Sequence, residues 1–298
     1  MIILKKLNSQ NMNEFKDIYV KSRVDENYDK DFFKVYDEEN FVIRFLLKKF
    51  LKLFYYNNKI IGFMWYETPI DINIRIWALY IENKYIDLLD ENLLSTFDNS
   101  ILVYETIDNN RNMHTLQNLG FKKVRPTVFM ELSLTNYNRD MYILNSDYEY
   151  TKKNKTKEFI KFKTFSIGED EKIRCNLQND IFSEWNRVPL TVEDIYNDLN
   201  QDYYINDLSI FIEVNNRRVG YGQIVFNRDI YTVVNFGIIN EYRGKGYGRE
   251  LLNKLIILSK EKRIKNLYIR VDESNIKARN LYEYCGFTEK YMVSRWDR

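Results

Sequence analysis

The chain has 298 residues, enough for about two domains at roughly 150 residues each. Hydrophobic residues make up 45% of it, so a sizeable core can be buried. Its 45 Lys and Arg residues nearly balance 43 Asp and Glu residues, and the net charge is +2. This balance gives no electrostatic case for a nucleic-acid or membrane partner, and we predict neither.

Few residues of the chain are suited to redox or metal chemistry. The two cysteines, Cys175 and Cys285, are too few for a disulfide scaffold and fit a reducing compartment. The single histidine, His114, has no Cys or His neighbour at metal-ligand spacing, so we predict no metal site and a surface or packing role for this residue. Residues 1–6 indicate a short strand rather than a signal peptide, and no apolar run approaches the roughly 20 residues needed to span a bilayer. We therefore predict a soluble, cytoplasmic protein.

An internal repeat organises the chain. The matching features are the Asn-Asn pairs at residues 57–58 and 215–216, the glycines at 62 and 220, the helix-opening asparagines at 109 and 275, and the Gly-Phe pairs at 120–121 and 286–287. Each Asn-Asn pair separates two β-rich runs and predicts a hairpin turn. Two copies of one mixed α/β unit account for these matches. The glycine-rich segment 243–248 occurs in the second copy and has no counterpart in the first.

The repeat also predicts the domain boundaries. We expect a degenerate first domain over residues 1–136, a linker or edge strand over residues 137–156, and a second domain over residues 157–298. The apolar spacing predicts helices over residues 12–23 and 32–50 in the first copy, and over 169–185 and 192–199 in the second. Thr191 is placed to cap the last of these helices.

The segment 243–248 has the features of a phosphate-binding loop. A β-branched and aromatic strand over residues 231–239 precedes it, and an apolar helical stripe over residues 249–260 follows. Glycines between a strand and a helix N-terminus let several backbone N–H groups and the positive end of the helix dipole point at one anion. The segment lacks the Gly-x-x-x-x-Gly-Lys-Ser/Thr pattern, and Arg249 stands at the third glycine of Gly-x-Gly-x-x-Gly.

Two motifs resemble those of the GNAT superfamily of N-acetyltransferases. The first is Arg-x-x-Gly-x-Gly, filled by Arg243, Gly246 and Gly248. The second is Asn-x-x-Ala-x-x-Leu-Tyr followed by Gly-Phe, which runs from Asn275 to Phe287 after a predicted strand. Together they cover roughly 60 residues. The resemblance implies an α/β fold of two tandem GNAT-like domains, each with a mixed, mainly antiparallel sheet flanked by helices.

The resemblance also implies a cofactor and a mechanism. Acetyl-CoA, or another acyl-CoA, would be the co-substrate, with its pantetheine arm alongside the strand at residues 236–238 and its pyrophosphate on the glycine loop. Tyr282 matches the tyrosine that protonates the departing CoA thiolate, and its reference pKa near 10 keeps it protonated at pH 7. A strand N–H near residues 236–238 would stabilise the oxyanion. The predicted cofactor-binding residues are Phe236, Gly237, Ile238, Arg243, Gly244, Lys245, Gly246, Tyr247, Gly248, Arg249, Asn275 and Tyr282.

No general base is evident in the sequence. Arg270 stands where some family members carry Glu, and it either recognises an acidic group of the acceptor or is a solvated cation at a strand end. Acidic residues that could act through a water molecule are Asp229, Asp272, Glu273 and Glu184. Cys285 occupies a small apolar position and is interpreted as a packing residue.

The first copy lacks the loop glycines and carries Leu116 at the place of Tyr282. We therefore expect it not to bind CoA in the usual manner, and to wall the acceptor site or to serve as scaffold. The predicted function is acetyl-CoA-dependent acetylation of a primary amine, on a small molecule or a peptide, by direct transfer in a ternary complex. The alternative is a non-catalytic acyl-CoA-binding sensor or interaction module. Homodimer formation is left open.

Overall fold

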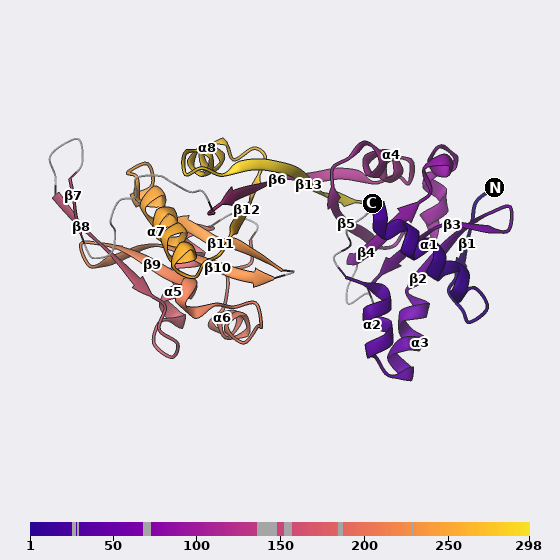
Figure 1. The fold of residues 1–298 in the computed structure, drawn as a ribbon, viewed down its shortest axis with the longest axis horizontal. Helices are drawn as coiled ribbons and strands as arrows, with labels where there is room; N and C mark the ends of the chain where they lie inside the picture. Colours follow the sequence, from indigo (N-terminus) through magenta and orange to yellow (C-terminus); the bar gives the residue numbers. More distant parts are fainter. Residues whose placement is uncertain are drawn as a thin grey trace. The chain divides into compact units, whose positions relative to one another are not determined.

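The computed structural model describes residues 1–25, 28, 30–67, 73–135, 148–151, 157–183, 187–227 and 229–298. These residues form two compact units (Figure 1). The first unit comprises Met1–Pro126 together with Met292–Arg298, and the second comprises Thr127–Tyr291. Within the described residues, no helix is long and apolar enough to cross a membrane.

The first unit is a mixed sheet with helices on it. Its strands are β1 (Ile3–Lys6), β2 (Leu51–Tyr56), β3 (Lys59–Tyr66), β4 (Asn73–Ile81) and β5 (Ile101–Ile107), in that order, followed by residues 293–297 of β13 (Thr288–Asp297). Its helices are α1 (Met12–Asp25), α2 (Phe32–Glu38), α3 (Phe41–Lys49), α4 (Asn110–Asn118) and the 3-10 helices η1 (Asn83–Leu88) and η2 (Glu91–Phe97). Neighbouring strands are antiparallel except β4 and β5, which are parallel.

The second unit repeats this strand pattern. Its sheet has the order β7 (Tyr148–Thr151), β8 (Lys157–Thr164), β9 (Ser209–Val214), β10 (Arg217–Asn227), β11 (Ile230–Ile238), β12 (Asn266–Asp272), and then residues 127–133 of β6 (Lys122–Ser133). Its helices are α5 (Glu171–Ile181), α6 (Val192–Leu199), α7 (Tyr247–Glu261), α8 (Ile276–Tyr284) and the 3-10 helices η3 (Asn206–Leu208) and η4 (Asn240–Tyr242). Here β11 and β12 are the parallel pair. The predicted α/β fold of two similar mixed sheets is confirmed.

The two units divide the chain differently from the boundaries that we expected from sequence. The first unit ends at Pro126 rather than near residue 136, and the last seven residues belong to it rather than to the second domain. Burial explains the difference, because Met130 (0% exposed) packs in the core of the second unit and Trp296 (2% exposed) packs in the core of the first. The expected linker at residues 137–156 lies mostly outside the described residues, although β7 within it forms an edge strand.

Local sequence signals account for several elements. Both Asn-Asn turns have positive φ angles, 47° and 61° in the first unit and 51° and 65° in the second, as the tight hairpin turn requires. Thr191 caps α6 in a capping box with Asp194. The expected single helix over residues 32–50 is wrong, because the Asn40 side chain accepts hydrogen bonds from the amides of Val42 and Ile43 and starts a new helix there.

Candidate active site

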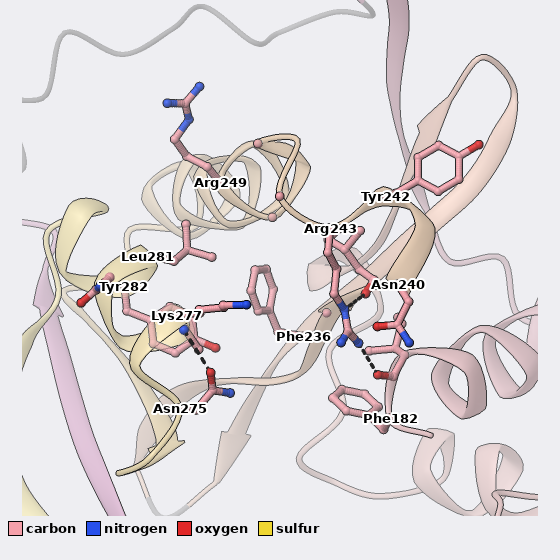
Figure 2. Close-up of a pocket in the computed structure, with 18 of the residues that line it drawn as sticks. Phe182, Phe236, Asn240, Tyr242, Arg243, Arg249, Asn275, Lys277, Leu281 and Tyr282 are labelled. Atoms are coloured by element: carbon pink, nitrogen blue, oxygen red, sulfur yellow. Dashed lines mark hydrogen bonds between the residues drawn. The ribbon is translucent and has the colours of Figure 1, made fainter. Parts of the chain in front are cut away.

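The second unit contains a pocket of about 750 Å³ (Figure 2). It lies between the C-terminal half of β11, the glycine loop, the first turn of α7, one side of α8 and the C-terminal end of α5. Its lining residues are Ile181, Phe182, Ser183, Phe236, Gly237, Ile238, Asn240, Tyr242, Arg243, Gly244, Gly246, Gly248, Arg249, Asn275, Lys277, Ala278, Asn280, Leu281 and Tyr282. The two motifs that were far apart in the sequence therefore meet at one cavity.

The pocket opens where two parallel strands diverge. The pairing of β11 with β12 begins at Tyr231↔Leu267 and ends at Val233↔Ile269, whereas β11 stays paired with β10 as far as Ile238. Beyond Val233 the edge of β11 that faces β12 has no ladder partner among the described strands. The backbone groups on that edge are therefore available to an extended ligand, except the carbonyl oxygen of Ile238, which accepts a hydrogen bond from Arg243.

A β-bulge in β11 decides which side chains face the pocket. The register with β10 shifts between Tyr221 and Gln223, and Asn235 adopts a positive φ of 51°. After the bulge, Gly237 faces α5, where an added Cβ would lie 2.3 Å from Cγ2 of Ile181. Phe236 is thereby placed on the opposite face, beside α7 and α8. In a strand that alternated without a bulge it would face α5.

The glycine loop leaves the N-terminus of α7 open. Gly246 is the N-cap of this helix with a φ of 94°, and it provides no side chain to cap the first amides. Gly244 also has a positive φ, of 74°. Both angles strongly favour glycine. Uncapped amides and the helix dipole together form a site suited to a phosphate group.

The charged residues of the loop are held in different ways. Arg243 donates from Nε to the carbonyl oxygen of Ile238 (2.7 Å) and from Nη2 to that of Ile181 (2.6 Å). It therefore fastens the loop to β11 and α5. Arg249 forms an ion pair with the buried carboxylate of Glu250 at 3.1 Å.

Two predicted cofactor-binding residues do not line the pocket. The ammonium of Lys245 lies 4.8 Å from the ring centre of Tyr242. Tyr247 is 1% exposed, and its hydroxyl donates a hydrogen bond to Glu158 of β8. These two side chains support the loop from outside the cavity.

Helix α8 supplies the other wall. Asn275 accepts a hydrogen bond from the amide of Ala278 at 3.1 Å and so caps the helix, as the motif predicts (Figure 2). Tyr282 is 6% exposed, and its ring centre lies 6.0 Å from that of Phe236 at an interplanar angle of 63°. Burial raises the pKa of Tyr282 above its ordinary value, so its hydroxyl is protonated at neutral pH. Among the described residues this hydroxyl has no hydrogen-bond partner.

Several lining residues were not predicted. Lys277 follows the capping Asn275 by two residues, so the motif itself could have pointed to it. No local sequence pattern pointed to Phe182 and Ser183 at the end of α5, because they reach the pocket only through the tertiary packing of α5 near β11.

None of the described residues that line the pocket is Asp, Glu or His. Of the acidic residues considered in the sequence, Asp272 accepts hydrogen bonds from the amide and the hydroxyl of Ser274, at 3.0 and 2.6 Å. Asp229 and Glu273 are outside the lining, and Glu184 lies outside the described residues. Arg270 donates from Nε to Oγ1 of Thr127 on β6, at 2.6 Å.

The corresponding space in the first unit is about 10 Å³. Arg111, two residues after the helix cap Asn109, donates from Nη2 to the carbonyl oxygen of Ile81 at 2.9 Å and lies 4.3 Å from the ring centre of Tyr80. Leu116, at the place of Tyr282, is 1% exposed. Side chains of the first unit therefore fill the space that is open in the second.

A strand divergence, an uncapped helix N-terminus and a buried tyrosine surround one cavity of the second unit. The model of the acetyltransferase (GNAT) family matches residues 175–287. The [ribosomal protein bS18]-alanine N-acetyltransferase of Haemophilus influenzae is 36% identical over 102 residues, which cover 34% of this chain and 66% of that protein, just under two thirds of its length. The second unit therefore contains a region, residues 175–287, that matches the GNAT acetyltransferase family.

Solved structures extend the likeness to the whole fold. A GCN5-related N-acetyltransferase from Sphaerobacter thermophilus has a TM-score of 0.68 at 13% identity and covers 100% of this chain and 95% of its own. A tandem GNAT protein from the clavulanic acid biosynthesis pathway has a TM-score of 0.54 at 10% identity, with 100% of this chain and 98% of its own covered. At these identities the likeness concerns the fold, and it supports the tandem arrangement.

Proposed function

We propose that the second unit is an acetyl-CoA-dependent N-acetyltransferase that acts on a primary amine by direct transfer in a ternary complex. One observation carries the proposal: the uncapped N-terminus of α7 and the buried, protonated Tyr282 border the same pocket. A phosphate group at the helix and a thioester near the tyrosine would use both ends of the cavity. The proposed setting is the cytoplasm, which suits two buried cysteines that form no disulfide.

Each part of the pocket has a role in the proposed reaction. Amides of the loop from Gly244 to Gly248 would bind the pyrophosphate. The free edge of β11 at residues 236–238 would pair with the amides of the pantetheine arm, and one N–H there would stabilise the oxyanion. Asn275 already caps α8 with its side-chain oxygen, so its part in cofactor binding is to hold that wall in place.

The proposed reaction transfers the acetyl group directly and needs no covalent enzyme intermediate. The neutral amine nitrogen attacks the thioester carbonyl carbon, the C–N bond forms and the C–S bond breaks. Tyr282 donates its proton to the departing thiolate, the nitrogen gives up a proton to water, and the tyrosinate regains a proton from solvent. The lining residues that the structure describes offer no carboxylate or imidazole to accept the proton from the nitrogen, so we assign that transfer to solvent.

The acceptor is proposed to be a peptide or a small-molecule amine. The relative named as a [ribosomal protein bS18]-alanine N-acetyltransferase supports a peptide amine as one candidate. The absence of acidic residues from the described part of the lining favours a second candidate function, an acyl-CoA-binding module without turnover.

A thiol-release assay with acetyl-CoA separates the two functions. The amine panel should include peptides with an N-terminal alanine, polyamines and amino sugars. The transferase predicts CoA release that depends on one class of amine and falls in Tyr282→Phe. Binding of acetyl-CoA without release for any amine would favour the binding module.

A further inference from the structure

We infer that Phe236 sets the length of the acyl group and restricts this site to acetyl and similarly short chains. The inference rests on the proposed function, since it takes the ligand of the pocket to be an acyl-CoA. It concerns the chain's own aromatic residue at the inner end of the cavity.

Exposure gives the pocket a direction. Gly244 is exposed and lines the pocket beside the open N-terminus of α7. Tyr282 is buried and Phe236 is half-buried, and their rings meet at the other end. A ligand that places its phosphates at the N-terminus of α7 would therefore extend its acyl group toward Phe236 and Tyr282, which are labelled in Figure 2.

The Phe236 ring has little freedom to move away from an incoming chain. It lies against Gly222 of β10, where an added Cβ would be 3.1 Å from Cδ2 of Phe236 and 2.9 Å from Cδ1 of Leu255. Because Gly222 has no side chain, the ring of Phe236 can pack against the backbone of β10 at this position. On its other side the ring contacts Tyr282, which is itself backed by Phe287 at 6.2 Å between ring centres.

The bulge at Asn235 fixes the direction of this side chain. Uninterrupted alternation would place Phe236 on the α5 face together with Val234, away from the pocket. The extra residue instead turns it toward Leu255 and Tyr282. A longer acyl chain would need the volume that the ring now fills, and an aliphatic pocket discriminates about 10- to 200-fold per methylene.

The test measures dissociation constants by calorimetry, and kcat/KM by thiol release, for acetyl-, propionyl-, butyryl- and hexanoyl-CoA. Phe236→Leu is a mild variant and Phe236→Ala opens the site fully. Phe226→Ala, which removes a 40% exposed ring on β10 outside the pocket, is the matched control.

Wild type should prefer acetyl-CoA to hexanoyl-CoA at least 10-fold. Phe236→Ala should raise the affinity for hexanoyl-CoA relative to acetyl-CoA by 10-fold or more, Phe236→Leu should shift it in the same direction, and the control should leave it unchanged. A ratio unchanged in both Phe236 variants, or equal use of all chains by wild type, overturns the inference. The expected binding ratios without turnover would support the inference while rejecting the transferase, and no binding of any acyl-CoA would reject both.

Discussion

Arg243 donates a hydrogen bond from Nη2 to the backbone carbonyl oxygen of Ile181 at 2.6 Å, so the glycine loop is fastened to the last residue of α5. A second bond from Nε reaches Ile238 at 2.7 Å. The arginine at the first position of the Arg-x-x-Gly-x-Gly motif therefore forms hydrogen bonds with the protein's own backbone. The arginine brings three backbone segments together at the pocket, and the amides of the loop remain available to an anion.

Replacing Arg243 by Gln should loosen the loop and weaken acetyl-CoA binding by about tenfold. Hydrogen bonds from a charged donor contribute about 1.5–3 kcal/mol each, and exposure of this side chain reduces that value. Arg243→Lys should be nearly as weak, since one ammonium cannot reproduce the fork of a guanidinium. Calorimetry would measure the affinity. The control is Arg217→Gln, which removes an exposed ion pair with Glu241; equal affinities for wild type and Arg243→Gln would contradict the clamp.

Tyr282→Phe should lower kcat about 100-fold and leave the dissociation constant of acetyl-CoA within twofold of wild type, because the hydroxyl acts on the departing thiolate. Tyr284→Phe on the same helix, with a side chain 55% exposed, is the control. A kcat that does not change in Tyr282→Phe would remove the proposed acid.

The pH dependence of kcat follows from the same burial. The pKa of Tyr282 is raised, so its protonated, donating form persists above pH 10, the ordinary pKa of tyrosine. Between pH 7 and pH 10 the rate should therefore show no decline that depends on Tyr282. A fall in kcat near pH 9 that occurs in wild type and is absent from Tyr282→Phe would instead show that the pKa of Tyr282 is ordinary or lowered.

The last seven residues of the chain belong to the first unit, so a mutation there should destabilise that unit. Trp296 is 2% exposed in the core of the first unit, and its neighbours on β13 pair with β5. Trp296→Ala should destabilise the first unit by about 3–5 kcal/mol. Thermal melts with acetyl-CoA identify the second unit, whose transition rises with ligand. The variant should lower the other transition, and a loss confined to the ligand-sensitive transition would contradict the division of β13.

Local signals predicted the parts of the site that depend on short segments. The glycine loop needs positive φ angles at Gly244 and Gly246, and only glycine meets that need readily, so the residues reveal the geometry. The cap at Asn275 is visible for a similar reason, because a side-chain oxygen at that position bonds to the amide three residues later. The cap at Thr191 was predicted on the same grounds, and the structure adds the reciprocal bond from Asp194 that makes it a capping box.

Features that depend on pairing between distant strands were not predictable. Strand β6 pairs with β12 and strand β13 pairs with β5, partners that lie far away in the sequence and are set by packing across the fold. The bulge at Asn235 interrupts the alternation of side chains in an otherwise regular strand. Only the pairing of β11 with β10 reveals it. The filling of the first unit's cleft by Arg111 likewise depends on a contact with Ile81, 30 residues away.

The central claim is tested most directly by calorimetric titration of acetyl-CoA into wild type and Gly248→Trp. Gly248 lies in the first turn of α7, where an added Cβ would be 3.4 Å from Cδ2 of Leu281 at ordinary contact distance, so an indole there should fill the pocket and leave the helix intact. We predict one bound acetyl-CoA per chain for wild type and none for the variant, with unchanged circular dichroism. No binding by wild type, equal binding by the folded variant, or two sites per chain would contradict the account.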